Sequence, residues 1–271
     1  MASDRTNAKT IFYANTLEEA FYQLKTVADL QIVGGCTAIS ELAEKTLSIR
    51  TIPELCSFDK HERYFDFGPG VTLAQIEAIG KNNLPAVLYE ALHSIANPQI
   101  KNMATIGGNL CNSAYKHTLF APLLALDTRL EVKREQETAY IPLAKFTGVP
   151  EQYLLTKIRI PTDEWEVAVF RRLGPAHIIT DMSASFVFLA NTQKNMIANL
   201  RIACAGSFCF RSMELENKLI GSHLPIPEKN IMEFIEEAEA QFSQSTTDSE
   251  ITPIVQAQFL NLIKFSLEQL T

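Results

Sequence analysis

The sequence predicts an α+β fold, in which groups of strands and groups of helices follow one another along the chain. In the second half, three strand-like segments precede two long amphipathic segments instead of alternating with them, as a parallel α/β fold would require. The 271 residues are 46% hydrophobic and 20% charged, which is ordinary for a globular protein with a sizeable core.

Charge and hydropathy exclude several classes of protein. The formal net charge of −7 argues against a nucleic-acid binder, which normally carries a basic surface. No apolar run reaches the roughly 18 residues that a membrane span needs. The polar start, Met1–Arg5, leads into no signal-peptide core. These features predict a cytoplasmic protein without a membrane span.

The cysteines give no sign of a metal site or a disulfide framework. The chain has five, which are Cys36, Cys56, Cys111, Cys204 and Cys209. Their number is odd and no CxxC pair occurs, so reduced thiols are expected. An iron–sulfur cluster, if one is needed, must therefore lie on another chain.

Periodicity and capping residues place the elements of the first third. Thr16 and Glu19 form a capping box that opens a helix over about 17–28. A short apolar strand at 30–33 runs directly into Gly34-Gly35. The further elements predicted here are a helix at 39–45, extended chain at 47–55, a strand at 64–67 closed by Gly68-Pro69-Gly70, and a helix from Thr72 to about Lys81.

The expected domain boundary lies at Pro161–Trp165, and the pattern of predicted elements changes there. The segment 91–114 is read as a helix followed by a loop and a glycine turn, and Pro122 suits a first helical turn. Strands are expected at 129–133, 139–143, 153–160, 166–173, 184–190 and 198–205, and helices at 227–242 and 252–270.

Two glycine turns are the candidate binding elements. Gly34-Gly35 follows a strand, where successive N–H groups can surround an anion and no Cβ blocks a ligand. In the second turn, Thr105 and Asn109 flank Gly107-Gly108 and carry side chains that can donate to phosphate oxygens. Either turn alone could be an ordinary turn without a ligand. Together they favour a diphosphate cofactor, although neither GxGxxG nor GxxxxGK[ST] occurs.

The stretch Asn97–Leu110 resembles a family signature, (S/N)PQIRN-x-ATIGGNL, with Lys101 in place of the usual arginine. This signature belongs to the FAD-binding subunits of molybdenum hydroxylases of the xanthine and carbon-monoxide dehydrogenase type. The resemblance extends over most of the chain, through Val33–Thr37, Ala121–Asp127, Phe170–Gly174 and the 205–221 segment.

The resemblance implies a PCMH-type FAD-binding domain over 1–163, built from two α+β subdomains at about 1–55 and 56–163. A smaller α+β domain of the carbon-monoxide dehydrogenase flavoprotein type would follow over 164–271. It would contain a three-stranded antiparallel sheet and helices.

The resemblance also implies the cofactor-binding residues. One side of the pyrophosphate would be lined by Ile32, Val33, Gly34, Gly35, Cys36, Thr37, Ala38 and Ile39, and the other by Thr105, Gly107, Gly108, Asn109 and Asn112. Ile95 would pack on the isoalloxazine ring, Leu155 near the adenine or the ring system, and Arg171 near the pyrimidine end of the flavin, where a cation favours the anionic reduced form.

One position departs from the family pattern. The family commonly continues with ASP-x-x-D, whose aspartate binds the ribose region, whereas Thr118 occupies that position here. The missing carboxylate removes a charge-assisted hydrogen bond worth about 1.5–3 kcal/mol. Either FAD binds less tightly or the loop is arranged differently.

The function implied is that of an electron-relay subunit without catalytic or metal-binding residues of its own. Partner subunits would carry Mo-molybdopterin (the large subunit) and [2Fe–2S] clusters (the small subunit), and NAD⁺ or another acceptor would take the electrons from FAD. Two alternatives remain open: an assembly subunit that has lost FAD, and a stand-alone flavin oxidoreductase.

Overall fold

The computed structural model describes residues 9–112, 115–175, 178–180, 182–246 and 251–270. They form two compact units, each assembled from segments that are distant in sequence. The first unit takes in the described residues of 1–76, 97–111 and 129–160, and the second those of 77–96, 112–128 and 161–271. The linear division at residue 163 stays a prediction.

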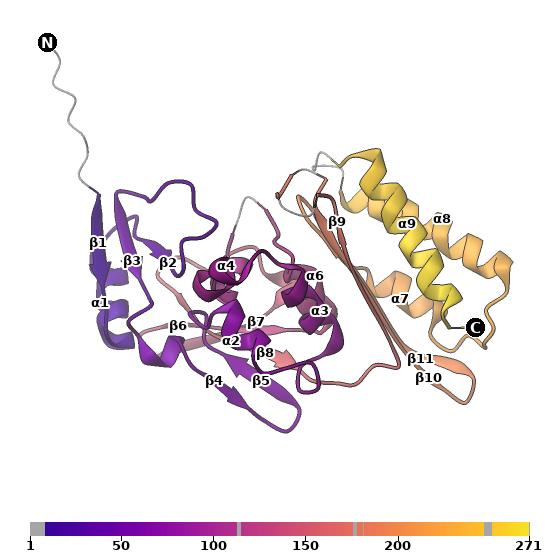
Figure 1. The fold of residues 1–271 in the computed structure, drawn as a ribbon, viewed down its shortest axis with the longest axis horizontal. Helices are drawn as coiled ribbons and strands as arrows, with labels where there is room; N and C mark the ends of the chain where they lie inside the picture. The colour runs from indigo at the N-terminus through magenta and orange to yellow at the C-terminus, as the bar shows by residue number, and fades with distance from the viewer. Residues whose placement is uncertain (1–8, 113–114, 176–177, 181, 247–250, 271) are drawn as a thin grey trace, which may run out of the picture. The chain divides into compact units, whose positions relative to one another are not determined.

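The first unit contains a small parallel sheet beside helix α1 (Leu17–Thr26) (Figure 1). The strand order is β1 (Thr10–Tyr13), β3 (Lys45–Ser48), β2 (Gln31–Val33). The Thr16 side chain caps α1 by accepting a hydrogen bond from the Glu19 N–H, as predicted. A small core that includes Ala20 and Leu47 joins the helix to the sheet.

A five-stranded antiparallel sheet forms the rest of the first unit. Its order is β4 (Phe58–Lys60), β5 (Tyr64–Phe67), β8 (Leu154–Pro161), β6 (Arg129–Arg134), β7 (Glu137–Pro142). A short 3₁₀ turn at Pro53–Leu55 precedes β4, and another at Leu143–Lys145 follows β7. Buried apolar side chains such as Leu130 and Ile158 alternate with charged ones such as Arg129, as expected for a sheet with one solvated face.

The second unit is a four-stranded antiparallel sheet with helices on both faces (Figure 1). The order is β12 (Cys209–Phe210), β11 (Met196–Ala205), β10 (Ala184–Gln193), β9 (Val167–Leu173). Helices α3 (Ala86–Ser94) and α6 (Phe120–Ala125) cover one face, and α7 (Met213–Leu219), α8 (Glu228–Ser245) and α9 (Pro253–Glu268) cover the other. Because both faces are covered, every residue from Ala184 to Ala190 is buried.

The predicted α+β class is confirmed, and the predicted three-stranded sheet gains the short β12. Three local predictions were wrong. No helix forms at 39–45, because Lys45 already belongs to β3, which pairs between β1 and β2. The 97–110 loop contains two short helices, α4 (Pro98–Met103) and α5 (Ile106–Leu110). The helix predicted from Thr72 to about Lys81 is shorter, since α2 (Leu73–Glu77) ends four residues earlier.

The described residues contain no helix that is both long and apolar enough to cross a lipid bilayer.

The pair Asp66–Arg159 joins β5 to β8. The guanidinium donates from Nε and Nη2 to the two carboxylate oxygens of Asp66, each at 2.8 Å. Burial tends to raise the pKa of Asp66, but the hydrogen bonds and charge of Arg159, with help from Lys157, outweigh burial and lower it. Since β5 leads directly into Gly68-Pro69, this pair also positions the loop on which the second glycine turn rests.

Asp66→Asn tests this pair. A depressed carboxyl pKa adds stability that is present at neutral pH and is lost as the pH falls through the folded-state pKa. We expect the free energy of unfolding of the variant at pH 7 to be about 1–3 kcal/mol lower than that of the wild type. Between neutral pH and pH 3 the variant should lose less of its free energy of unfolding than the wild type does. Urea unfolding at several pH values measures both. If the free energy of unfolding falls equally with pH in both proteins, the stabilising role of the Asp66–Arg159 pair is contradicted.

Candidate functional site

The first glycine turn follows β2 and has unusual backbone geometry. Cys36 adopts a left-handed conformation, with φ +56°, directly after Gly34-Gly35. A non-glycine residue in this region costs about 1–2 kcal/mol, so the surrounding structure must hold it there. The chain therefore turns directly after strand β2.

The second glycine turn is the short helix α5. Thr105 caps it, its Oγ1 accepting from the Gly108 N–H at 3.1 Å. The loop after β5 holds the start of the helix, since Gly107 N–H donates to the Pro69 carbonyl at 2.9 Å and Ile106 N–H to the Val71 carbonyl at 3.0 Å. The helix therefore stands on the backbone that follows β5.

The two turns pack directly against each other. A Cβ on Gly35 would lie 1.8 Å from the carbonyl oxygen of Met103, and a Cβ on Gly34 would lie 2.7 Å from Thr105 Oγ1. Separations below 3.0 Å do not occur for real Cβ atoms. These two glycines therefore serve the contact between the turns, whereas the sequence suggested that they serve the approach of a ligand.

Gly108 differs from the other turn glycines. A Cβ there would meet only Thr105 Oγ1, at 3.2 Å, and the residue is exposed. Gly107, by contrast, is buried against Pro69. Of the glycines in the two turns, Gly108 is the one whose missing side chain leaves room for something outside the protein.

The two turns also differ in which N–H groups are already bonded. In the second turn the N–H groups of Ile106, Gly107, Gly108 and Asn109 all donate to protein acceptors. In the first turn, none of the N–H groups of Gly34, Gly35, Cys36, Thr37 and Ala38 donates to an acceptor within the described ranges. Because Gly35 is buried, an unpaired amide there costs about 1–3 kcal/mol unless water or a ligand accepts from it.

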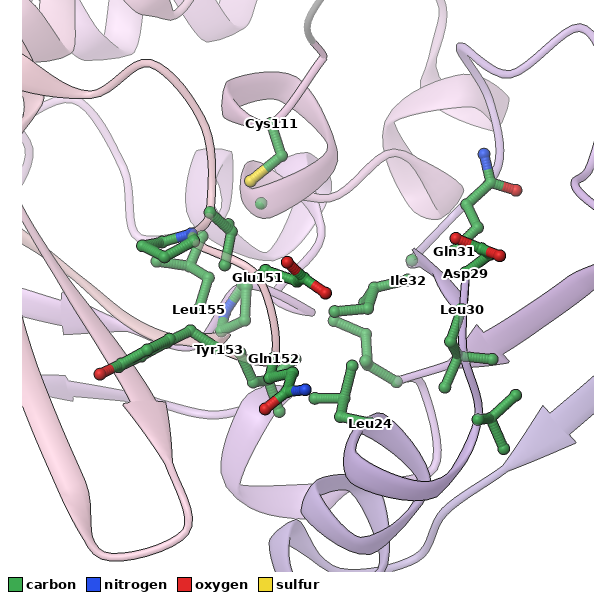
Figure 2. A pocket seen from close by; sticks show the side chains of 18 of the residues that line it. Leu24, Asp29, Leu30, Gln31, Ile32, Cys111, Glu151, Gln152, Tyr153 and Leu155 are labelled. Carbon is green, nitrogen blue, oxygen red and sulfur yellow. The ribbon is translucent and has the colours of Figure 1, made fainter.

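A cavity of about 700 Å³ opens beside both turns within the first unit (Figure 2). This volume is in the range of small-molecule sites in proteins. Gly34 and Ile32 from the first turn, and Thr105 and Gly108 from the second, line the same cavity. The structure thus brings together two segments that lie about seventy residues apart in the chain.

The predicted site residues of the first unit fall into two groups. Those in the cavity wall are Ile32, Gly34, Thr105, Gly107, Gly108 and Leu155. Those in or beside the turns but outside the wall are Val33, Gly35, Cys36, Thr37, Ala38, Ile39 and Asn109. In the second group Val33 and Gly35 are buried, and Cys36, Thr37 and Ala38 are exposed.

The other predicted site residues belong to the second unit. Ile95 is half-buried at the end of α3, and Thr118 is half-buried before α6. The exposed Arg171 lies on β9 and donates to the carbonyl of Phe170 at 2.7 Å. Asn112 organises its own loop, accepting from the Tyr115 N–H at 3.3 Å and lying 3.0 Å from His117 Nε2. Burial lowers the pKa of His117, which keeps its ring neutral at pH 7.

Several residues of the cavity wall were not predicted from the sequence. Leu24 and Leu30 come from the end of α1 and the loop after it, and Val149–Tyr153 come from the loop before β8. In Figure 2 the side chains of Leu24, Ile32 and Leu155 surround the cavity, and Glu151 points into it. The residue types of these wall positions indicate only core or loop residues in the sequence. They come together in one cavity through long-range strand pairing.

Residues 6–163 match the family described as the FAD binding domain in molybdopterin dehydrogenase. The chain belongs to this family. The resemblance seen in the 97–110 signature is thereby confirmed.

Proteins similar to this chain include named subunits of a dehydrogenase and of a hydroxylase. The chain is 36% identical over 103 residues to a xanthine dehydrogenase FAD-binding subunit of Escherichia coli O157:H7, a stretch that covers 37% of this chain and 33% of the relative. It is 27% identical over 229 residues to the nicotine 6-hydroxylase medium subunit of Paenarthrobacter nicotinovorans, covering 77% of this chain and 79% of that protein.

Solved structures share the fold along the whole chain. A chain of carbon monoxide dehydrogenase from Hydrogenophaga pseudoflava superposes with a TM-score of 0.80, covering 96% of both chains at 16% identity. A chain of quinoline 2-oxidoreductase from Pseudomonas putida gives 0.76 at 15% identity, covering 97% of this chain and 95% of the other. These likenesses establish the fold of this family member.

The contact between the turns predicts different outcomes at two glycines. Gly35→Ala forces a Cβ against the Met103 backbone, so we expect the free energy of unfolding to fall by about 1–3 kcal/mol or more. Gly108→Ala lies in a helix, and its Cβ meets Thr105 Oγ1 at 3.2 Å with no backbone in the way, so it should change stability by less than about 1 kcal/mol. Urea unfolding of both variants measures the difference. Equal losses would show that the turns do not pack as described.

Proposed function

We propose that this chain is the FAD-carrying subunit of a molybdenum hydroxylase complex. In this proposal electrons from [2Fe–2S] clusters on a small partner subunit pass through this chain to NAD⁺ or another acceptor. Substrate oxidation takes place at Mo-molybdopterin on a large partner subunit. Bound FAD supplies the redox chemistry that links one-electron and two-electron carriers. Reduced thiols throughout the chain agree with a cytoplasmic location.

The observation that carries the proposal is the row of unbonded N–H groups in the first turn, beside a cavity shared with the second. Main-chain N–H groups that converge on one point form an anion site without any cationic side chain. A diphosphate offers the acceptors that these groups lack. The residues present therefore fit the pyrophosphate of FAD.

The two turns have separate tasks in this proposal. The N–H groups of Gly34–Ala38 donate to phosphate oxygens. Thr105 already accepts from Gly108, so its hydroxyl hydrogen is available as a donor to the same anion. Gly108 lets the ligand approach the backbone, while Ile32 and Leu155 offer apolar contacts farther along the cavity.

The residues of the second unit have proposed roles that are less direct. Ile95 would pack on the isoalloxazine ring, and Arg171 would stabilise negative charge at its pyrimidine end. Asn112 would act by shaping its loop, because its side chain is engaged with Tyr115 and His117. Thr118 would offer a hydroxyl where the family pattern has a carboxylate.

Two other functions make different predictions for the purified protein. An assembly subunit without FAD would be colourless, and Thr118 is the feature that favours it. A stand-alone flavin oxidoreductase would be yellow and would turn over a small alcohol in isolation. The proposed subunit is yellow, releases FAD on denaturation, and has no such turnover. An absorption spectrum and an analysis of the released flavin distinguish the three.

Gly108→Asp tests the placement of the pyrophosphate. A carboxylate at this position meets the phosphates with like charge and with a Cβ, so we expect FAD affinity to fall at least tenfold. Asn102→Asp is the control, since it adds the same charge at an exposed position outside the cavity wall. Fluorescence titration of the apoprotein with FAD measures both. Wild-type affinity in Gly108→Asp would place the site elsewhere.

Partner subunits are tested by purification of the tagged chain from its native cells. The proposal predicts two further chains, with molybdenum and iron in fixed ratio to FAD. Recovery of the chain with FAD but without these metals would contradict the complex while leaving FAD binding intact.

A further inference from the structure

The cavity beside the turns is lined by residues of different chemistry. Its wall includes Gly34, Thr105, Gly107 and Gly108 from the turns, and apolar side chains, among them Leu24, Leu30 and Leu155. In the view of Figure 2 the carboxylate of Glu151 points into the cavity, between Cys111 at the α5 end and Leu24. Residues of the two glycine turns, a carboxylate and apolar side chains thus line one cavity.

Glu151 has no partner within the described part of the chain. It is exposed on the loop before β8 and makes neither a hydrogen bond nor an ion pair there. Lys25 is the single cationic side chain in the described wall, and its Nζ binds Glu135 at 2.8 Å. The Glu151 carboxylate is therefore available to accept hydrogen bonds from a ligand.

A free carboxylate beside a diphosphate site is unfavourable unless the ligand offers donors to it. Like charges repel, so this part of the cavity rejects a further phosphate. Sugar hydroxyls are neutral donors, and acidic side chains accept from ribose hydroxyls in other dinucleotide sites, where a phosphorylated ribose requires an arginine instead. In a nucleotide the sugar is joined directly to the phosphates, and Glu151 lines the same cavity as Gly34, Thr105 and Gly108.

We propose that Glu151 accepts hydrogen bonds from the ribose hydroxyls of the adenosine half of the cofactor and thereby selects against nucleotides that carry a further phosphate on that ribose. This inference rests on the proposed function, because it takes the diphosphate to lie at the glycine turns. It assigns Glu151 as a specificity-determining residue of that site.

The test uses ADP, 2′,3′-dideoxy-ADP and 2′-phospho-ADP as probes, which compete with FAD for the apoprotein. The wild type should bind ADP at least about tenfold more tightly than it binds either analogue. Glu151→Gln keeps the size of the side chain but removes the charge. It should weaken ADP binding about tenfold, and it should reduce both the preference for ADP over 2′,3′-dideoxy-ADP and the preference for ADP over 2′-phospho-ADP. Asp29→Asn removes the same charge elsewhere on the cavity wall and should leave both preferences unchanged.

The outcomes separate this inference from the proposed function. Failure of the wild type to bind FAD or ADP overturns the proposed function and the inference with it. Tight FAD binding with equal affinity for ADP and dideoxy-ADP overturns the role of Glu151 alone. Equal changes in Glu151→Gln and Asp29→Asn also overturn it, because they would report the net charge of the cavity and not a ribose contact.

Discussion

The close contact between two glycine turns is the constraint on which the site depends. Gly35 lies so near the Met103 carbonyl that no larger residue fits, and the same contact aligns the first turn with Thr105. The first turn follows directly on strand β2. The second turn is held by hydrogen bonds to the loop after β5. The geometry of the cavity wall therefore follows from backbone packing and not from mobile side chains.

This packing gives the two turns unequal chemistry. The helical turn at Thr105–Asn109 uses its own N–H groups to hold itself together, so it presents a hydroxyl and an open glycine. The N–H groups of Gly34–Ala38 donate to no acceptor among the described residues, and Cys36 is held in a left-handed conformation. In the proposed site a neutral backbone would hold the doubly charged diphosphate, in a chain whose net charge is −7.

The sequence predicted the parts of this site better than their arrangement. Local signals such as the Thr16 cap, the strand before Gly34 and the strands at 166–173, 184–190 and 198–205 are found in the structure because they depend on near neighbours. The helix expected at 39–45 does not form: Lys45 pairs with Thr10 in the small parallel sheet, and residues 39–44 lie in the loop before that strand. Glu151 and Leu24 reach the cavity only through long-range pairing, which no local pattern encodes.

The most direct measurement of the central claim is the ¹⁵N–¹H spectrum of the apoprotein during titration with FAD. If the first turn supplies the donors, the amide signals of Gly34, Gly35 and Cys36 should shift strongly and become protected from solvent exchange. The amides of Ile106 and Gly107, already bonded within the protein, should shift less. Unchanged signals from the first turn at saturating FAD would contradict the account.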